Sequence, residues 1–220
     1  MSSWSTLVQL VGTATAQTLI MVFFSTLFSF ILGAPLGVLL CITAEGNLMP
    51  KPVLHQLIDR VVNVLRSFPF IILMILLFPL SRILAGTSIG TPAAIIPLSI
   101  AAAPFAARVI ETALKEVDPG VVQAARAMGS TDFQIIVKVL LPEALPSLTA
   151  GITLTIINLI GYSAMAGAIG GGGLGDLAIR YGYQRFRPDV MAVSVIVILI
   201  LVEIIQAAGT KLSAAQMKKR

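Results

Sequence analysis

Residues 190–208 read VMAVSVIVILILVEIIQAA, and Glu203 is the only charged residue among them. An α-helix rises about 1.5 Å per residue, so roughly 20 apolar residues cross a hydrocarbon layer about 30 Å thick. The stretch is predominantly aliphatic without alternation, whereas a strand of an outer-membrane barrel would alternate between apolar and polar residues. It therefore predicts an integral membrane protein built from helices.

The composition of the whole chain supports this class. Of 220 residues, 57% are hydrophobic and only 11% are charged, against about 25% charged in soluble domains. The single cysteine, Cys41, excludes a disulfide framework, and the single histidine, His55, with no second Cys or His near it, argues against a zinc or haem cluster. The net charge of +5 comes without a basic patch interleaved with aromatic residues, so nucleic-acid binding is not expected.

Five apolar stretches are long enough to span a membrane. We place the spans at residues 17–42, 61–80, 89–110, 145–169 and 190–208. With the N-terminus outside, eleven Lys and Arg residues fall on the inner side and four on the outer side, which favours an N-out, C-in orientation. Residues 1–12 are expected to form an interfacial segment, and residues 210–220 a basic cytoplasmic tail.

The inside loop, residues 111–143, is long for so short a chain and is expected to carry function. Asp118-Pro119 is a typical helix start, and Gly129 a typical helix end. Thr131 and Gln134 have the spacing of a capping box, which predicts a second helix over Asp132–Leu140 that ends at Pro142.

One face of the first loop helix is apolar. Val121, Ala124, Ala125 and Met128 follow the i, i+3, i+4, i+7 spacing. This face either packs against the chain's own spans or inserts into a groove of a partner protein, and the spacing does not distinguish these alternatives.

The fourth span carries polar and adaptable side chains on one stripe, formed by Thr155, Asn158, Tyr162, Met165 and Ile169. A polar side chain such as Asn158 is costly against lipid. It should therefore face either another helix or a water-filled path.

Enzymatic signatures are lacking. The sequence has no phosphate-binding P-loop, and the glycines of its G-x-G-x-x-G pattern (Gly170, Gly172 and Gly175) follow an apolar span rather than a strand. We interpret them as a flexible outer turn. No catalytic constellation is present, so the chain is not expected to be an enzyme. Glu203 is an intramembrane carboxylate that would suit a gradient-driven carrier, and Arg66 is expected at the inner start of the second span.

The loop resembles a known family. Gln123-Ala124-Ala125, Gly129, Val139 and Leu141-Pro142 are similar to the EAA loop of the permease subunits of ABC importers in every spacing, with Gln and Val where that family usually has Glu and Ile. Segments including Arg66–Ile72, Gly86–Gly90 and Gly161–Met165 extend the resemblance to methionine importer permeases, from about Thr13 to Gly209.

This resemblance implies a type I ABC permease domain over residues 13–209, forming a homodimer in the bacterial inner membrane. Two ATP-binding subunits would bind ATP and Mg²⁺, and this chain itself would hold no cofactor. A binding protein would deliver methionine, both D- and L-, from outside. Another small solute and a carrier using Glu203 are the alternatives. The residues implied to couple to the ATP-binding subunit are Val121, Gln123, Ala124, Ala125, Met128 and Gly129. Those implied to border the translocation path or gate are Asn158, Tyr162, Ser163 and Met165.

Overall fold

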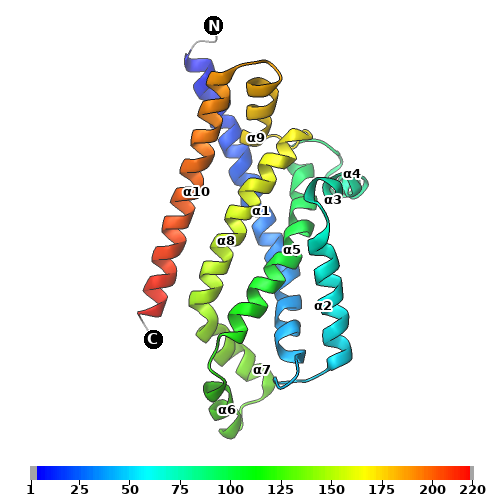
Figure 1. The fold of residues 1–220 in the computed structure, drawn as a ribbon, viewed down its shortest axis with the longest axis vertical. Coiled ribbons are helices and arrows are strands. Elements are labelled where there is room, and N and C mark those ends of the chain that lie inside the picture. The colour runs from blue at the N-terminus through cyan, green and yellow to red at the C-terminus, as the bar shows by residue number, and fades with distance from the viewer. Residues whose placement is uncertain (1–3, 219–220) are drawn as a thin grey trace.

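Helices make up the fold, as Figure 1 shows, and residues 4–218, the part that the structure describes, include no strand. The structure is a computed structural model. In chain order its elements are α1 (Trp4–Thr43), α2 (Pro52–Ser67), α3 (Phe70–Leu76), α4 (Phe78–Ala85), α5 (Thr91–Lys115), α6 (Pro119–Ala127), α7 (Asp132–Ile135), the π-helix η1 (Ile136–Leu140), α8 (Leu141–Ala168), α9 (Gly173–Leu177), the π-helix η2 (Ala178–Tyr183) and α10 (Pro188–Met217).

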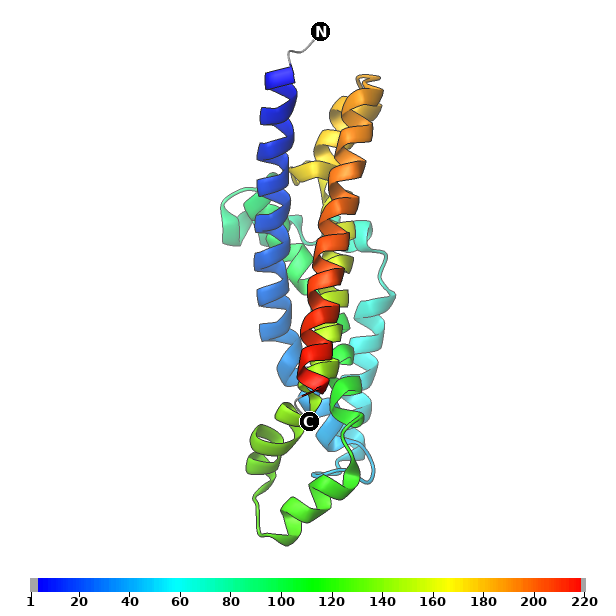
Figure 2. The ribbon, with the colours of Figure 1, turned by 90° about the vertical axis from the view of Figure 1, so that its left-hand side faces the viewer.

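Four helices are long and apolar enough to cross a membrane: α1, α5, the continuous helix from α7 through α8, and α10. They coincide with four of the five predicted spans. The bundle has two ends in Figure 2: a loop end, which carries α6, α7 and residues 44–51, and an opposite end, which carries the N-terminus of α1 together with α9 and η2. Helix α1 has 40 residues, which corresponds to about 60 Å, and its first turns extend beyond the neighbouring α5. Residues 1–3 of the predicted interfacial segment lie outside the described residues, as do residues 219–220 of the tail.

Close packing of α1 against α5 forms the centre of the bundle. Gly33 and Gly37 are one turn apart on α1, and a Cβ atom at either position would lie 2.6 Å from Ala103 O or 2.5 Å from Ala107 O. The two backbones can approach this closely because glycine lacks a side chain and α5 presents alanines. Ser99 Oγ of α5 donates to Ile95 O of its own helix at 2.6 Å, and Ser25 Oγ of α1 donates across the contact to the same carbonyl at 3.4 Å.

The second predicted span is not one continuous helix. Helix α2 ends at Ser67, Phe68 is extended, and Pro69 precedes the short helices α3 and α4. Proline has no backbone N–H to donate and disfavours helical geometry in the residue before it, which explains why the break falls at Phe68. The apolar stretch at 61–80 is thus divided between α2 and α3–α4, which turn aside near the opposite end in Figure 1.

The glycine segment after the fourth span, expected to be a flexible outer turn, leads into two further short helices. Gly170, Gly172 and Gly173 have positive φ angles of 89°, 81° and 81°, and the chain then forms α9 and η2 instead of a simple connection. The backbone N–H groups of Gly173 and Leu174 donate to Gln17 Oε1 and Thr18 Oγ1 of α1, both at 2.9 Å. The segment is therefore anchored to the first helix.

Helix α10 lies at the side of the bundle and is mostly exposed. Its exposed side chains include Ile196, Leu199, Ile200 and Ile204, as expected of a surface that faces lipid. Glu203 is exposed among them. It lines none of the cavities found among the described residues.

Candidate coupling and transport surfaces

Helix α6 begins and ends as the sequence predicts. Asp118 Oδ1 accepts a 2.7 Å hydrogen bond from the backbone N–H of Gly120, and Pro119 occupies the first turn. At the other end, Gly129 has a φ of +83°, a conformation that costs glycine little and other residues more. These two signals fix a nine-residue helix at the loop end of the molecule.

The apolar face of α6 is divided between the protein interior and the surface. Ala125 is buried in a core cluster with Leu114, Ile135 and Leu140, which come from α5, α7 and η1. Val121, Ala124 and Met128 are exposed, and Met128 retains 80% of its accessible surface. Both interpretations of the face therefore have support: one edge packs on the chain itself, and the other is free to contact a partner.

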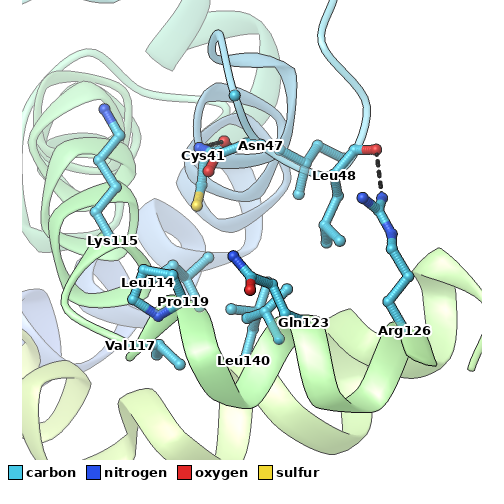
Figure 3. A pocket seen from close by; sticks show the side chains of 13 residues that line it. Cys41, Asn47, Leu48, Leu114, Lys115, Val117, Pro119, Gln123, Arg126 and Leu140 are labelled. Atoms are coloured by element: carbon cyan, nitrogen blue, oxygen red, sulfur yellow. Dashed lines mark hydrogen bonds between the residues drawn. The ribbon is translucent and has the colours of Figure 1, made fainter. Parts of the chain in front are cut away.

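Arg126 fastens α6 to the segment after α1. Its Nη2 donates to Leu48 O at 3.0 Å, drawn as a dashed line in Figure 3, and to Asp132 Oδ1 at 3.2 Å. Leu48 is buried in the same core cluster as Ala125. Movement of α6 is consequently linked to residues 44–51 by a charge-assisted hydrogen bond as well as by apolar packing.

A cleft of about 230 Å³ lies behind α6, between this helix and the end of α1. Figure 3 shows the side-chain amide of Gln123 directed into the cleft, toward Cys41 and Asn47. Asn47 Nδ2 donates to Cys41 O at 2.6 Å, which holds this wall in place. Gln123, where the resembling family usually has Glu, thus lines the cleft on the inner side of α6. Both Gln123 and its neighbour Ala124 are exposed.

The helix after α6 starts as predicted but does not end at Pro142. The capping box is present: Thr131 Oγ1 accepts from Gln134 N at 3.3 Å, and Gln134 Oε1 accepts from Thr131 N at 3.0 Å. Helix α7 then passes through the π-helix η1 directly into α8. The backbone N–H of Leu141 bonds Ile136 O, five residues back, and this wider turn accommodates a proline that has no N–H. The second half of the loop is therefore helically continuous with the fourth span.

The four predicted path residues of α8 differ in how exposed they are. Asn158 and Met165 are exposed, and Tyr162 is half-buried and stacked on Phe70 of α3, with ring centroids 4.6 Å apart. Ser163 is buried and donates to Ile160 O at 2.7 Å. Thr155 of the predicted stripe is also buried and bonds its own helix. The exposed stripe runs instead through Leu154, Asn158, Gly161, Met165 and Ala168.

Two cavities lie along this side of the bundle, one above the other. The cavity of about 260 Å³, here called the upper cavity, is lined by Asn158, Tyr162 and aromatic residues of α2–α5. The cavity of about 490 Å³, the lower cavity, reaches Glu116 and Ser147 near the loop end. Arg66 and Phe105 line both. Together the cavities follow α8 from its middle to the start of the loop.

A polar network that sequence analysis missed joins α2 to α5. Arg108 donates to Asp59, to Asn63 Oδ1 at 2.8 Å and to Glu111 Oε2 at 2.7 Å. Lys115 Nζ completes it with a 2.6 Å contact to Glu111 Oε1. The hydrogen bond from Arg108 lowers the pKa of the Asp59 carboxyl, so the pair is charged at neutral pH. Asp59 and Arg108 are 49 positions apart, and no local pattern relates them.

Long apolar helices, a partly exposed apolar face on α6 and two cavities beside α8 are the features of a polytopic membrane permease subunit. The sequence model of the family described as binding-protein-dependent transport system inner membrane component matches residues 33–208. The match covers well over half of the chain. The protein therefore belongs to this family and is a multi-pass inner membrane component of an ABC transporter.

Individual relatives are more specific. The chain is 52% identical to the probable D-methionine transport system permease protein MetI of Vibrio cholerae over 91% of this chain and 89% of the relative. It is 47% identical to the corresponding protein of Pasteurella multocida over 93% and 94%. A solved structure of inward-facing conformations of the MetNI methionine ABC transporter superposes with a TM-score of 0.95 and 45% identity, covering 98% of this chain and 99% of that one.

Proposed function

We propose that this chain is the permease subunit of an ATP-driven importer for methionine, in its D- and L-forms. The observation that carries the proposal is the agreement with a methionine ABC transporter in both fold and sequence over nearly the whole chain. The EAA-like loop alone would leave the cargo open. Identity near 50% to D-methionine permeases selects methionine over another small solute.

The chain crosses the membrane five times with its N-terminus outside. Helices α1, α5, α8 and α10 make four crossings. Residues 61–80, divided between α2 and α3–α4, make the second, which is interrupted at Phe68-Pro69. The excess of Lys and Arg in the segments at the loop end supports placing that end in the cytoplasm. The exposed face of α6 then points toward a cytoplasmic partner.

Two ATP-binding subunits dock on two copies of this chain. Val121, Ala124 and Met128 of α6 provide the contact, because they are exposed and apolar. Ala125 positions the helix from within, and Gln123 lines the cleft behind it. Closure of the ATP-binding subunits moves α6, and the continuous helix from α7 to α8 carries that movement to the path.

The translocation path runs along the exposed stripe of α8, between the two copies. Asn158 and Met165 contact the solute, and Tyr162 with Phe70 forms an aromatic wall. Ser163 is buried against its own helix and sets the local shape of α8 rather than touching the solute. A binding protein delivers methionine at the opposite end. ATP hydrolysis belongs to the partner subunit.

A gradient-driven carrier is the alternative from a different class. Its proton site would be Glu203. This side chain is exposed on the surface of α10 that faces away from the bundle, and it lines no cavity among the described residues. Glu203→Gln should therefore leave uptake unchanged, whereas a carrier would lose it.

The decisive experiment is ATPase activity and methionine uptake in proteoliposomes that contain this chain with an ATP-binding subunit and a binding protein. Ala124→Glu should abolish coupled activity, because it places a charge on the exposed docking face. Ala215→Glu is the matched control: it makes the same change at an exposed position of α10 near the loop end. If Ala124→Glu kept the coupled ATPase activity and uptake of Ala215→Glu, docking through α6 would be refuted. A wild-type complex that imports no methionine would refute methionine as the cargo.

A further inference from the structure

Arg66 lies where the two cavities beside α8 meet. It lies in the last turn of α2, is exposed, and lines both the upper and the lower cavity. Among the described residues lining the upper cavity it is the only charged side chain. A solute that moved from one cavity to the other would pass it.

The charge of Arg66 is not neutralised within the described part of the chain. The other cation of the lower cavity, Arg108, is paired with Asp59 and Glu111, and Glu116 accepts a hydrogen bond from Ser147. The Arg66 guanidinium has no hydrogen-bond or ion-pair partner among residues 4–218. A guanidinium can bind a carboxylate with two parallel hydrogen bonds, and this one is free to do so.

The rest of the upper cavity suits the other parts of an amino acid. Asn158 contributes a side-chain amide that makes no hydrogen bond within residues 4–218, and an amide can both donate and accept. Phe68, Phe105 and the stacked pair of Phe70 and Tyr162 form apolar walls. One positive group, one neutral polar group and aromatic walls match a small molecule with a carboxylate at one end and an apolar side chain at the other.

We propose that Arg66 is a substrate-binding residue of the translocation path, which binds the α-carboxylate of the amino acid as it passes from the upper to the lower cavity. This inference rests on the proposed function. The carboxylate needs a countercharge when it leaves water for the aromatic-walled cavity, because an unpaired charge is costly there. The same guanidinium repels a solute that carries net positive charge, so the path discriminates against cationic amino acids.

The test uses Ala101→Cys, at another position that lines the upper cavity, in a Cys41→Ala background, within the complete complex, so that the introduced thiol is the only one in this chain. Its modification is followed by mass spectrometry of this chain with an anionic and a cationic methanethiosulfonate. With Arg66 present, the anionic reagent should react faster, and methionine should slow the reaction more than methioninol, which lacks the carboxylate. Arg66→Gln should remove both preferences, by about tenfold in protection, and Arg66→Lys should retain part of them.

Arg60→Gln is the matched control, an exposed arginine of the same helix that lines neither cavity. Equal protection by methionine and methioninol, or protection that survives Arg66→Gln, would overturn the inference, as would methionine uptake by Arg66→Gln at the wild-type rate. A complex with carboxylate-specific protection that imports no methionine would instead refute the proposed cargo and leave the carboxylate site standing.

Discussion

The guanidinium of Arg126 lies 3.0 Å from the carbonyl oxygen of Leu48, and this hydrogen bond joins the helix α6 to the segment that follows α1. The segment that follows the first helix and the exposed helix α6 are therefore in direct contact. Leu48 is also buried against the same core cluster as Ala125. Removing this contact therefore tests whether α6 and the first helix move together.

Arg126→Ala should uncouple ATP hydrolysis from transport. Without the hydrogen bond to Leu48, α6 can move while α1 stays in place, so ATPase activity is retained and uptake per ATP falls several-fold. Arg126→Lys keeps the charge but not the planar guanidinium, and it should give an intermediate ratio. Parallel loss of ATPase activity and uptake would show that the contact only maintains the fold.

Gly37→Ala should destabilise the bundle by about 1–3 kcal/mol. The added methyl group would lie 2.5 Å from Ala107 O and 2.8 Å from Ile110 Cβ, so α1 and α5 must separate. Gly12→Ala is the control on the same helix, because nothing lies within 4 Å of that position. Thermal unfolding in detergent should show a Tm lowered by several degrees for Gly37→Ala alone; equal Tm values for both variants would contradict the packing role.

Gly129→Ala should loosen α6 without disturbing the core. The new Cβ meets nothing within 4 Å, so its cost arises from the φ of +83° and amounts to roughly 1–2 kcal/mol. Gly129→Asn should cost less, because asparagine tolerates this conformation. Hydrogen exchange should accelerate in α6 and stay unchanged in α5. Uniform acceleration throughout the bundle would argue against a local effect.

The link between α2 and α5 should weaken in acid. Since the pKa of Asp59 is lowered in the folded state from its ordinary value of 3.8, its contribution is complete above that value and is lost as pH falls through the lowered pKa. Thermal stability of the wild type should therefore decline on the acid side more steeply than that of Asp59→Asn. Identical acid profiles would mean that the Arg108 contact adds no stability.

Local signals in the sequence predicted local structure well. The Asp118 cap, the Thr131–Gln134 capping box and the four long helices depend on neighbouring residues or on uninterrupted hydrophobicity, and all are present. The two prolines show where such signals conflict. Pro69 breaks a stretch that is apolar enough to span, whereas Pro142 fails to end a helix because a π-turn precedes it.

Features that depend on distant residues could not be predicted in this way. The pairing of Asp59 with Arg108 and the cavities beside α8 are produced by the packing of α2, α5 and α8. The face of α6 was recognised as apolar, but its division between buried Ala125 and exposed Ala124 requires the position of the core. Gly33 and Gly37, four residues apart on α1, are a sequence signal for close helix packing. The sequence does not indicate which helix packs there, and the structure shows that it is α5.

The hydrogen bonds from Gly173 and Leu174 to Gln17 and Thr18 span 156 positions of sequence, and they constrain how the protein is made. The first helix leaves the ribosome and enters the bilayer long before α9 has been synthesised. Until then, the amide of Gln17 and the hydroxyl of Thr18 lack their final hydrogen-bond partners. The bilayer core provides no water to replace these partners. The first helix therefore acquires these partners only when α8 and α9 have been synthesised, and truncation before residue 173 should yield a chain that membrane quality control recognises as unfinished.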